Sequence, residues 1–105
     1  MSKKSDDGNV KLKDKQDIEI QKPKKYKVVF HNDDFTPMDF VAYILVDQYK
    51  LDAESAVKIT YAIHEKGKGI AGVYSKEIAE TKSNRTNDMS RAFGFPLLTT
   101  IEPES

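Results

Sequence analysis

The stretch His31–Phe40, HNDDFTPMDF, decides how this chain is expected to fold. The apolar run from Val28 to Phe30 leads into it and is typical of a β-strand. Thr36 and Pro37 then predict a helix, because threonine suits the N-cap and proline suits the first helical position. The polar residues between strand and helix are therefore expected in a turn of fixed geometry.

Asn32, Asp33 and Asp34 occupy this turn, and two explanations fit them. Asparagine and aspartate favour turns because their side chains bond to nearby backbone groups. The same side chains would also form part of a binding site if the fold brought complementary groups beside them. The turn by itself leaves both explanations open.

Outward from this stretch, the predicted elements follow the order β-α-α-β-α-β. Strands are expected at Lys25–His31, Ile70–Tyr74 and Leu97–Ile101. Helices are expected to begin at Pro37, after Asp52 and after Ser75, and Gly67 is expected to end the second helix. The predicted fold class is α+β, a three-stranded antiparallel sheet with three helices packed on one face.

Apolar residues three and four positions apart give each predicted helix a face for the core. The first helix offers Phe40, Val41, Ile44, Leu45 and Gln48, the second Ala56, Ile59, Thr60 and Ile63, and the third Ile78, Ala79, Met89, Ala92 and Phe93. Gly94 and Pro96 are expected to end the third helix.

Charge divides the chain into two parts. Residues 1–25 carry eight lysines and five acidic residues, whereas residues 26–105 carry nine basic and twelve acidic residues. Residues 1–24 have too few apolar side chains to offset the entropy of ordering, so we expect a disordered extension before a core domain at 25–105. The negative net charge of the core domain argues against nucleic-acid binding, which needs a clustered basic face.

Cysteine is absent, which excludes disulfides and thiolate metal sites and suits a reducing compartment. No apolar run reaches the length needed to span a membrane, and the first residues lack the apolar segment of a signal peptide. These features predict a cytoplasmic protein without membrane contact.

Two patterns that suggest cofactor or metal binding are interpreted otherwise. Gly67–Gly72, GKGIAG, matches the G-x-G-x-x-G motif, but it follows a predicted helix and opens a strand, the reverse of a dinucleotide site. Residue types that bind metals recur at His31, Asp33, Asp34 and His64. None of them has the helical spacing of a ligand pair, so neither a metal nor a cofactor is expected.

His64 is expected near the end of the second helix, where the helix dipole favours a histidine. If it also faces the turn, it would form a polar rim with Asn32 and Asp33 beside apolar Met38 and Ile63. Such a rim accepts a cation next to space for an apolar side chain. No nucleophile motif such as G-x-S-x-G accompanies it. A binding module is therefore favoured over an acid/base or metal-assisted enzyme, and over an RNA-binding module that uses the basic extension.

Three motifs, HNDDFTPMDF, HEKGKGIAGVYSKEIAETK and GFPLLTTIEP, resemble those of the ClpS family in the same order, over Tyr26 to Pro103. The resemblance implies a bacterial, non-enzymatic adaptor that delivers N-degron substrates to a Clp AAA+ protease. It implies a monomer that contacts the N-terminal domain of a ClpA- or ClpC-type unfoldase through Glu77 and Lys82. The extension would be the arm that the unfoldase engages.

The resemblance also assigns roles within the site. Asn32, Asp33 and His64 are expected to accept hydrogen bonds from the α-amino group of a bound N-terminus. The first side chain, which is Leu, Phe, Tyr or Trp, is expected to enter a pocket lined by Asp34, Thr36, Met38, Val41, Thr60, Ile63 and Leu97. Met38 resembles a gatekeeper whose bulk disfavours β-branched first residues.

Thr60 departs from the family pattern, in which many members carry methionine at this position. Threonine is shorter and brings a hydroxyl, so the pocket is expected to be roomier or more polar. The order of preference among aromatic and aliphatic first residues is therefore left open.

Overall fold

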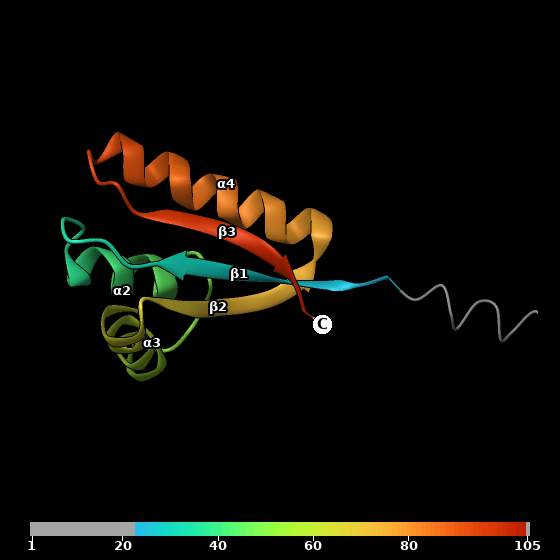
Figure 1. Ribbon diagram of the computed structural model, residues 1–105, viewed down its shortest axis with the longest axis horizontal. Helices are drawn as coiled ribbons and strands as arrows, with labels where there is room; N and C mark the ends of the chain where they lie inside the picture. Colours follow the sequence, from blue (N-terminus) through green and yellow to red (C-terminus); the bar gives the residue numbers. More distant parts are fainter. Residues whose placement is uncertain (1–22, 105) are drawn as a thin grey trace, which may run out of the picture.

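The computed structural model of the protein describes residues 23–104, which form a three-stranded sheet with three helices (Figure 1). In chain order the elements are β1 (Lys25–His31), α2 (Met38–Asp47), α3 (Ala53–Lys66), β2 (Lys68–Ser75), α4 (Lys76–Ala92) and β3 (Leu98–Pro103). The predicted α+β fold and its element order are confirmed. The disordered extension was expected at residues 1–24, and residues 1–22 of it lie outside the described residues.

The central strand of the sheet is β1, in the order β2-β1-β3, and both pairings are antiparallel. Val28, Val29 and Phe30 are all buried, which suits a strand with a neighbour on each side. Between β1 and β2 the register shifts after Val28, so that Ala71 is an extra residue on β2 and forms a β-bulge.

The core lies on the face of the sheet that carries Val28 and Phe30. All three helices contribute to it, through buried Phe40, Val41, Ile44, Leu45, Ala56, Ile63 and Ala79. The ring of Phe30 meets the ring of Tyr49 edge-on, with centroids 5.4 Å apart. Figure 1 shows α2 and α3 together near the C-terminal end of β1, whereas α4 lies along β3. The packed end of β1 therefore fixes where the turn after it begins.

The predicted caps of the second and third helices are confirmed. Asp52 accepts a hydrogen bond from the amide of Ser55 at 2.7 Å, and Ser75 accepts one from the amide of Ile78 at 3.4 Å. Gly67 ends α3 in the left-handed conformation, with φ of 94°, which glycine adopts without a steric penalty.

The predicted cap of the first helix is wrong by one residue. Pro37, in extended backbone with ψ of 141°, occupies the N-cap of α2, and no side chain caps this helix. The Thr36 hydroxyl instead donates to Oδ2 of Asp33 at 2.8 Å. Thr36 is therefore part of the turn and not of the helix.

The buried side of α4 also differs from the predicted one. Ala79 is buried and Met89 is half-buried as expected, but Ile78, Ala92 and Phe93 are exposed. The buried positions are completed by three small polar residues, Ser83, Thr86 and Ser90. Hydrogen bonds offset the burial of two of them, since Ser83 bonds to the Thr99 hydroxyl at 2.6 Å and Thr86 bonds to the Tyr49 hydroxyl at 2.7 Å.

None of the helices within residues 23–104 is both long enough and apolar enough to cross a lipid bilayer.

Candidate functional site

A cavity of about 170 Å³, here called the main cavity, opens between the turn after β1, the start of α2 and the second half of α3. Its lining residues are His31, Asn32, Asp33, Asp34, Thr36, Met38, Val41, Thr60, Ile63, His64 and Leu97. All ten residues expected to bind an α-amino group or a first side chain line this cavity. Their roles toward a ligand stay predictions.

Asp33 organises the turn at the mouth of the main cavity. Its Oδ1 accepts hydrogen bonds from the amides of Phe35 and Thr36, at 2.8 and 2.7 Å, and its Oδ2 accepts from the Thr36 hydroxyl. A carboxylate offers about four lone-pair directions, of which these bonds use three. One direction on Oδ2 is therefore left for a donor that enters the cavity.

The same contacts keep Asp33 charged. Burial raises the pKa of its carboxyl, but the hydrogen bonds from Phe35 and Thr36 and the charge of Arg91 outweigh burial, so the pKa is lowered overall. Asp33 is therefore an anion at neutral pH, fixed in orientation and able to attract a cationic group.

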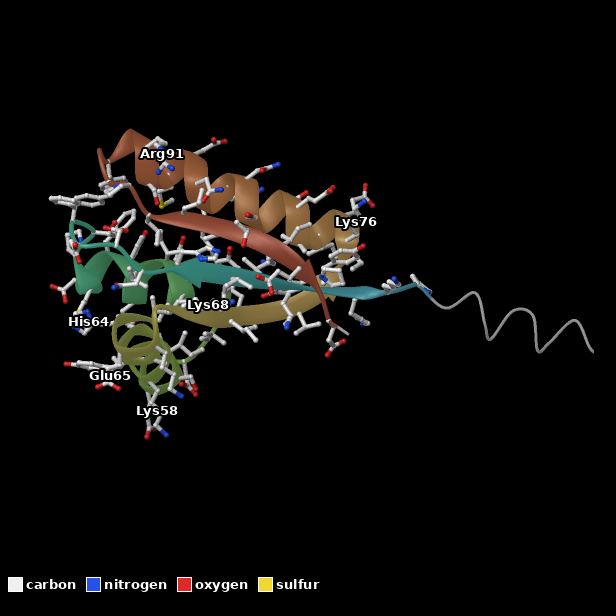
Figure 2. All side chains as sticks on the ribbon, viewed as in Figure 1. Lys58, His64, Glu65, Lys68, Lys76 and Arg91 are labelled. Atoms are coloured by element: carbon white, nitrogen blue, oxygen red, sulfur yellow. The ribbon has the colours of Figure 1, made fainter. Side chains whose placement is uncertain are left out.

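Asn32 and His64 come together because the turn is tied to the end of α3. The amide of Asn32 donates to the carbonyl of Gly67 at 2.9 Å, and the amide of Gly67 donates to the carbonyl of Ile63 at 2.9 Å. His64 projects from this end of α3, next to the start of α2 (Figure 2). The position of His64 therefore fits both explanations, a favourable interaction with the helix dipole and a place at the main cavity.

The floor of the main cavity is apolar and closely packed. Val41, Ile63 and Leu97 are buried, with at most 6% of each residue exposed. The Thr60 hydroxyl donates to the carbonyl of Ala56 at 2.8 Å, so its one hydrogen is used inside the helix. Of the two consequences expected for Thr60, this bond favours a roomier cavity over a more polar one.

Two further residues support the site: His31, which was considered from the sequence only as a metal ligand, and Arg91, which was not singled out. His31 lines the main cavity, and its Nε2 forms a hydrogen bond with the Thr100 hydroxyl at 2.8 Å. Arg91 donates to the carbonyls of Phe95 and Leu97 at 3.0 and 2.9 Å, which positions Leu97 in the floor. No local pattern marks Arg91, because its partners lie in a loop without periodicity.

Glu77 and Lys82, expected to contact a Clp ATPase, lie on α4, which contributes no side chain to the main cavity. Glu77 is exposed in the first turn of the helix. Lys82 is half-buried, and its Nζ donates to the carbonyl of Gln48 at 2.8 Å and lies within 5.5 Å of the ring centroids of Tyr49 and Tyr74. Lys82 therefore also has a structural role, joining α4 to the end of α2.

Across residues 23–104, no group of three or more histidine, cysteine, aspartate or glutamate side chains is arranged to hold a metal ion. The main cavity offers hydrogen-bond acceptors, the carboxylate of Asp33 held in a fixed orientation, and an apolar floor.

Comparisons with known proteins agree on one family. The family described as ATP-dependent Clp protease adaptor protein ClpS matches residues 21–100 of this chain. The ClpS adapter of Clostridium acetobutylicum is 46% identical over 99 residues, which cover 94% of each protein. ClpS 1 of Rhodopseudomonas palustris is 42% identical over 94 residues, which cover 90% of this chain and 91% of that protein.

Among solved structures, ClpS2 of Agrobacterium tumefaciens bound to L-phenylalaninamide matches with a TM-score of 0.77 and 36% identity. The match covers 79% of this chain and 100% of that one. Sequence, length and fold thus lead to the same assignment. This chain belongs to the ClpS family of ATP-dependent Clp protease adaptor proteins.

Proposed function

We propose that the main cavity binds the free α-amino group and the bulky first side chain of N-degron substrates. As a member of the ClpS family, the protein is a non-catalytic adaptor that delivers N-end rule substrates to the Clp protease. The observation that supports this proposal most strongly is a polar rim at the mouth of a cavity with an apolar floor. The polar rim consists of Asn32, Asp33, Asp34 and His64.

The rim suits an amino terminus. An α-amino group has a pKa of about 7.7–8.0, so it is mostly cationic at neutral pH. The open lone pair of Asp33 would accept a charge-assisted hydrogen bond from it, worth roughly 1.5–3 kcal/mol. Asn32 and His64 would accept the remaining hydrogens, directly or through water. An acetylated N-terminus has neither the charge nor these donors.

The main cavity suits an apolar first side chain. An engineered apolar cavity of about 150 Å³ binds benzene, so a cavity of about 170 Å³ has room for a leucyl or benzyl side chain. Burial of such a side chain contributes roughly 1.5–3 kcal/mol. L-phenylalaninamide, bound to the related ClpS2, carries both a free α-amino group and a benzyl side chain.

These two contributions are reduced by the entropy lost on association. An affinity on the order of micromolar is expected, which suits an adaptor that must release its substrate. Met38, half-buried at the cavity wall, would disfavour β-branched first residues through its bulk.

The partner face is also part of the proposal. Glu77 and Lys82 would contact the N-terminal domain of a ClpA- or ClpC-type unfoldase, and the extension, residues 1–24, would serve as the arm that the unfoldase engages. The monomeric state, the cytoplasmic location and the absence of nucleic-acid and membrane partners stay predictions from the sequence.

The test is a titration of the full chain with fluorescent peptides that differ only at the N-terminus. A peptide that begins with free Phe should bind with a dissociation constant in the micromolar range, and its acetylated twin should bind about tenfold to a hundredfold more weakly. Equal affinities for the two peptides would contradict the proposed use of the rim.

A further inference from the structure

A second hollow lies on the outer face of the sheet, the face opposite the one that carries Val28 and Phe30. This outer groove has a volume of about 320 Å³ and runs from the flank of α3 across the start of β2 to β1 and β3. Its lining residues are Lys27, Val29, Ala62, Lys66, Lys68, Gly69, Ile70 and Glu102. It shares no lining residue with the main cavity and is a separate surface.

The floor of the outer groove is apolar. Val29 lies between Val28 and Phe30 on β1, so its side chain points away from the core that those two residues join. Its partner on β2, Ile70, is 45% exposed. Gly69 keeps the α3 wall close to β2, because a Cβ atom there would lie 2.8 Å from a side-chain carbon of α3. The groove therefore offers apolar area that the fold leaves uncovered.

The walls of the outer groove are mainly basic. Lys27, Lys66 and Lys68 stand around the floor, and Glu102 is the one acidic residue of the lining. Among residues 23–104, no ion pair involves any of these four side chains. Lysine carries its ammonium group on a long apolar stem, so it can pack beside a ligand and meet a carboxylate at the same time. The groove suits an extended segment that carries carboxylates next to an apolar side chain.

The outer groove begins where the main cavity ends. His31 lines the main cavity, and its cross-strand partner Lys68 lines the groove. His31 also shares the outer face with Lys27 and Val29, because side chains two positions apart on a strand point to the same side. The main cavity therefore borders the outer face of the sheet at His31.

Strand geometry relates the two sites residue by residue. A strand rises about 3.3 Å per residue, so Val29 and Lys27 lie about 7 and 13 Å from His31 along β1. A peptide that leaves the main cavity in extended form covers about the same distance per residue. Its third residue then reaches Val29 and its fifth reaches Lys27. Its second residue stays close to the acidic side chains of the polar rim, where a negative charge is not favoured.

We propose that the outer groove binds the segment that follows the first residue of an N-degron substrate, and that it selects an apolar third residue followed by acidic fourth and fifth residues. This inference rests on the proposed function of the main cavity. Val29 and Ile70 would contact the apolar side chain, and Lys27 and Lys66 would attract the carboxylates.

The test is a titration of the full chain with three peptides that all begin with free Phe and carry Leu at position three. Positions four and five are both Asp, both Ser or both Lys. At low ionic strength the Asp peptide should bind about threefold to tenfold more tightly than the Lys peptide, the size expected for exposed ion pairs. The difference should shrink at high salt, because salt screens exposed charges.

The decisive variant is Lys66→Glu, at an exposed position that lines the outer groove and not the main cavity. It should abolish or reverse the preference for the Asp peptide. The matched control is Lys58→Glu, which makes the same change of charge on the same helix at a position that points away from the sheet (Figure 2). The control should keep the preference. Lys66→Gln should weaken the preference and keeps the test valid if Lys66→Glu does not fold.

Amide spectra give a direct readout of the groove. The Asp peptide should shift the amides of Val29 and Ile70 together with those of the polar rim, whereas the Lys peptide should shift the rim alone. Equal affinities for the Asp and Lys peptides, or equal loss of the preference in Lys66→Glu and Lys58→Glu, overturns the inference. Failure of the unsubstituted protein to bind even the Ser peptide contradicts the proposed function itself, so the two failures are distinguishable.

Discussion

Two regions of this protein carry clusters of polar side chains, and they differ in whether those side chains find partners inside the chain. The α4 polar cluster consists of Gln48, Tyr49, Lys82, Ser83, Thr86, Asn87 and Thr99, and each of these residues is hydrogen-bonded to another of them. At the polar rim, among the described residues 23–104, the side chains of Asn32, Asp34 and His64 make no hydrogen bond, and Asp33 keeps one acceptor direction open.

The α4 polar cluster shows what paired polar groups do. Asn87 accepts from the amide and hydroxyl of Thr99 at 2.8 and 3.1 Å and donates to its carbonyl at 3.1 Å, which joins α4 to β3. Burial raises the pKa of Tyr49 to about 12, so its hydroxyl stays protonated and able to bond. Among the residues that the structure describes, Ser90 Oγ is the one buried side-chain polar atom without a partner.

Whether polar side chains have partners within the chain therefore distinguishes residues that stabilise the fold from residues that are available to a ligand. Buried polar groups are almost always paired, so the α4 polar cluster stabilises the fold. The hydrogen-bond acceptors of the polar rim are exposed beside an apolar cavity. They contribute little to the stability of the fold and are available to bind a ligand. Substitutions in the first region should therefore change stability, and substitutions in the second should change binding.

The largest expected effect is on stability, in Asn87→Ala. The variant removes three hydrogen bonds and takes the side-chain acceptor away from the amide of buried Thr99, so the free energy of unfolding should fall by about 3 kcal/mol. Urea denaturation measures this change, and Asn84→Ala, at an exposed position on the same helix, is the matched control. If Asn87→Ala had normal stability but lost peptide binding, the distinction between a stabilising α4 polar cluster and a ligand-binding rim would be wrong.

The next largest effect is on binding, in Asp33→Ala. Loss of the Asp33 carboxylate should weaken the binding of a peptide with a free N-terminal Phe by about 1.5–3 kcal/mol. The turn also loses its three hydrogen bonds to Asp33, so the free energy of unfolding should drop by about 1 kcal/mol. Calorimetric titration and denaturation separate the two effects, with Asp47→Ala at the exposed end of α2 as control. A variant that binds normally would remove Asp33 from the site.

A smaller effect is expected in His64→Ala. The exposed side chain supplies one acceptor, so peptide affinity should fall by about 0.5–1.5 kcal/mol. Stability should change by no more than about 0.5 kcal/mol, as for other exposed positions. Glu65→Ala, at the neighbouring exposed position, should leave affinity unaltered. Equal losses of affinity in both variants would assign the effect to the helix end and not to the imidazole.

The smallest effect is the acid sensitivity of the turn. Since the folded-state pKa of Asp33 is lowered, its charge stabilises the fold above the unfolded value near 3.8, and this contribution disappears as the pH falls through the folded value. The stability difference between the protein and Asp33→Asn should therefore be greatest near pH 7 and shrink below pH 4. Asp52, whose pKa is lowered by the Ser55 amide, should show the same trend in Asp52→Asn. A difference independent of pH would contradict the assigned hydrogen bonds.

Local signals were sufficient for most of the fold. The apolar run of β1, the capping residues Asp52 and Ser75 and the glycine stop at Gly67 each act within a few residues, so the sequence predicts them directly. The N-cap of α2 is Pro37 and not the predicted Thr36, whose hydroxyl bonds to Asp33 instead. A preference for threonine at N-caps does not show whether its hydroxyl will bond to an amide of the helix or, as here, to a neighbouring carboxylate.

The buried side of α4 could not be predicted from apolar periodicity. Thr86 and Ser90 read as solvent-facing residues, yet both have 0% of their surface exposed, because α4 packs closely against its neighbours through small side chains. At the site, the resemblance to ClpS proteins named ten of the eleven residues that line the main cavity. It did not name His31, or Arg91, whose partners Phe95 and Leu97 lie in a loop without periodicity.

The most direct test of the central claim is a two-dimensional amide spectrum of the full chain recorded during titration with the free and the acetylated Phe peptide. The free peptide should shift the amides of Asn32, Asp33 and His64 and leave those of Asn87 and Thr99 in place, while the acetylated peptide at the same concentration should shift none of them. Equal shifts at the rim with both peptides, or shifts centred on Asn87 and Thr99, would contradict the account.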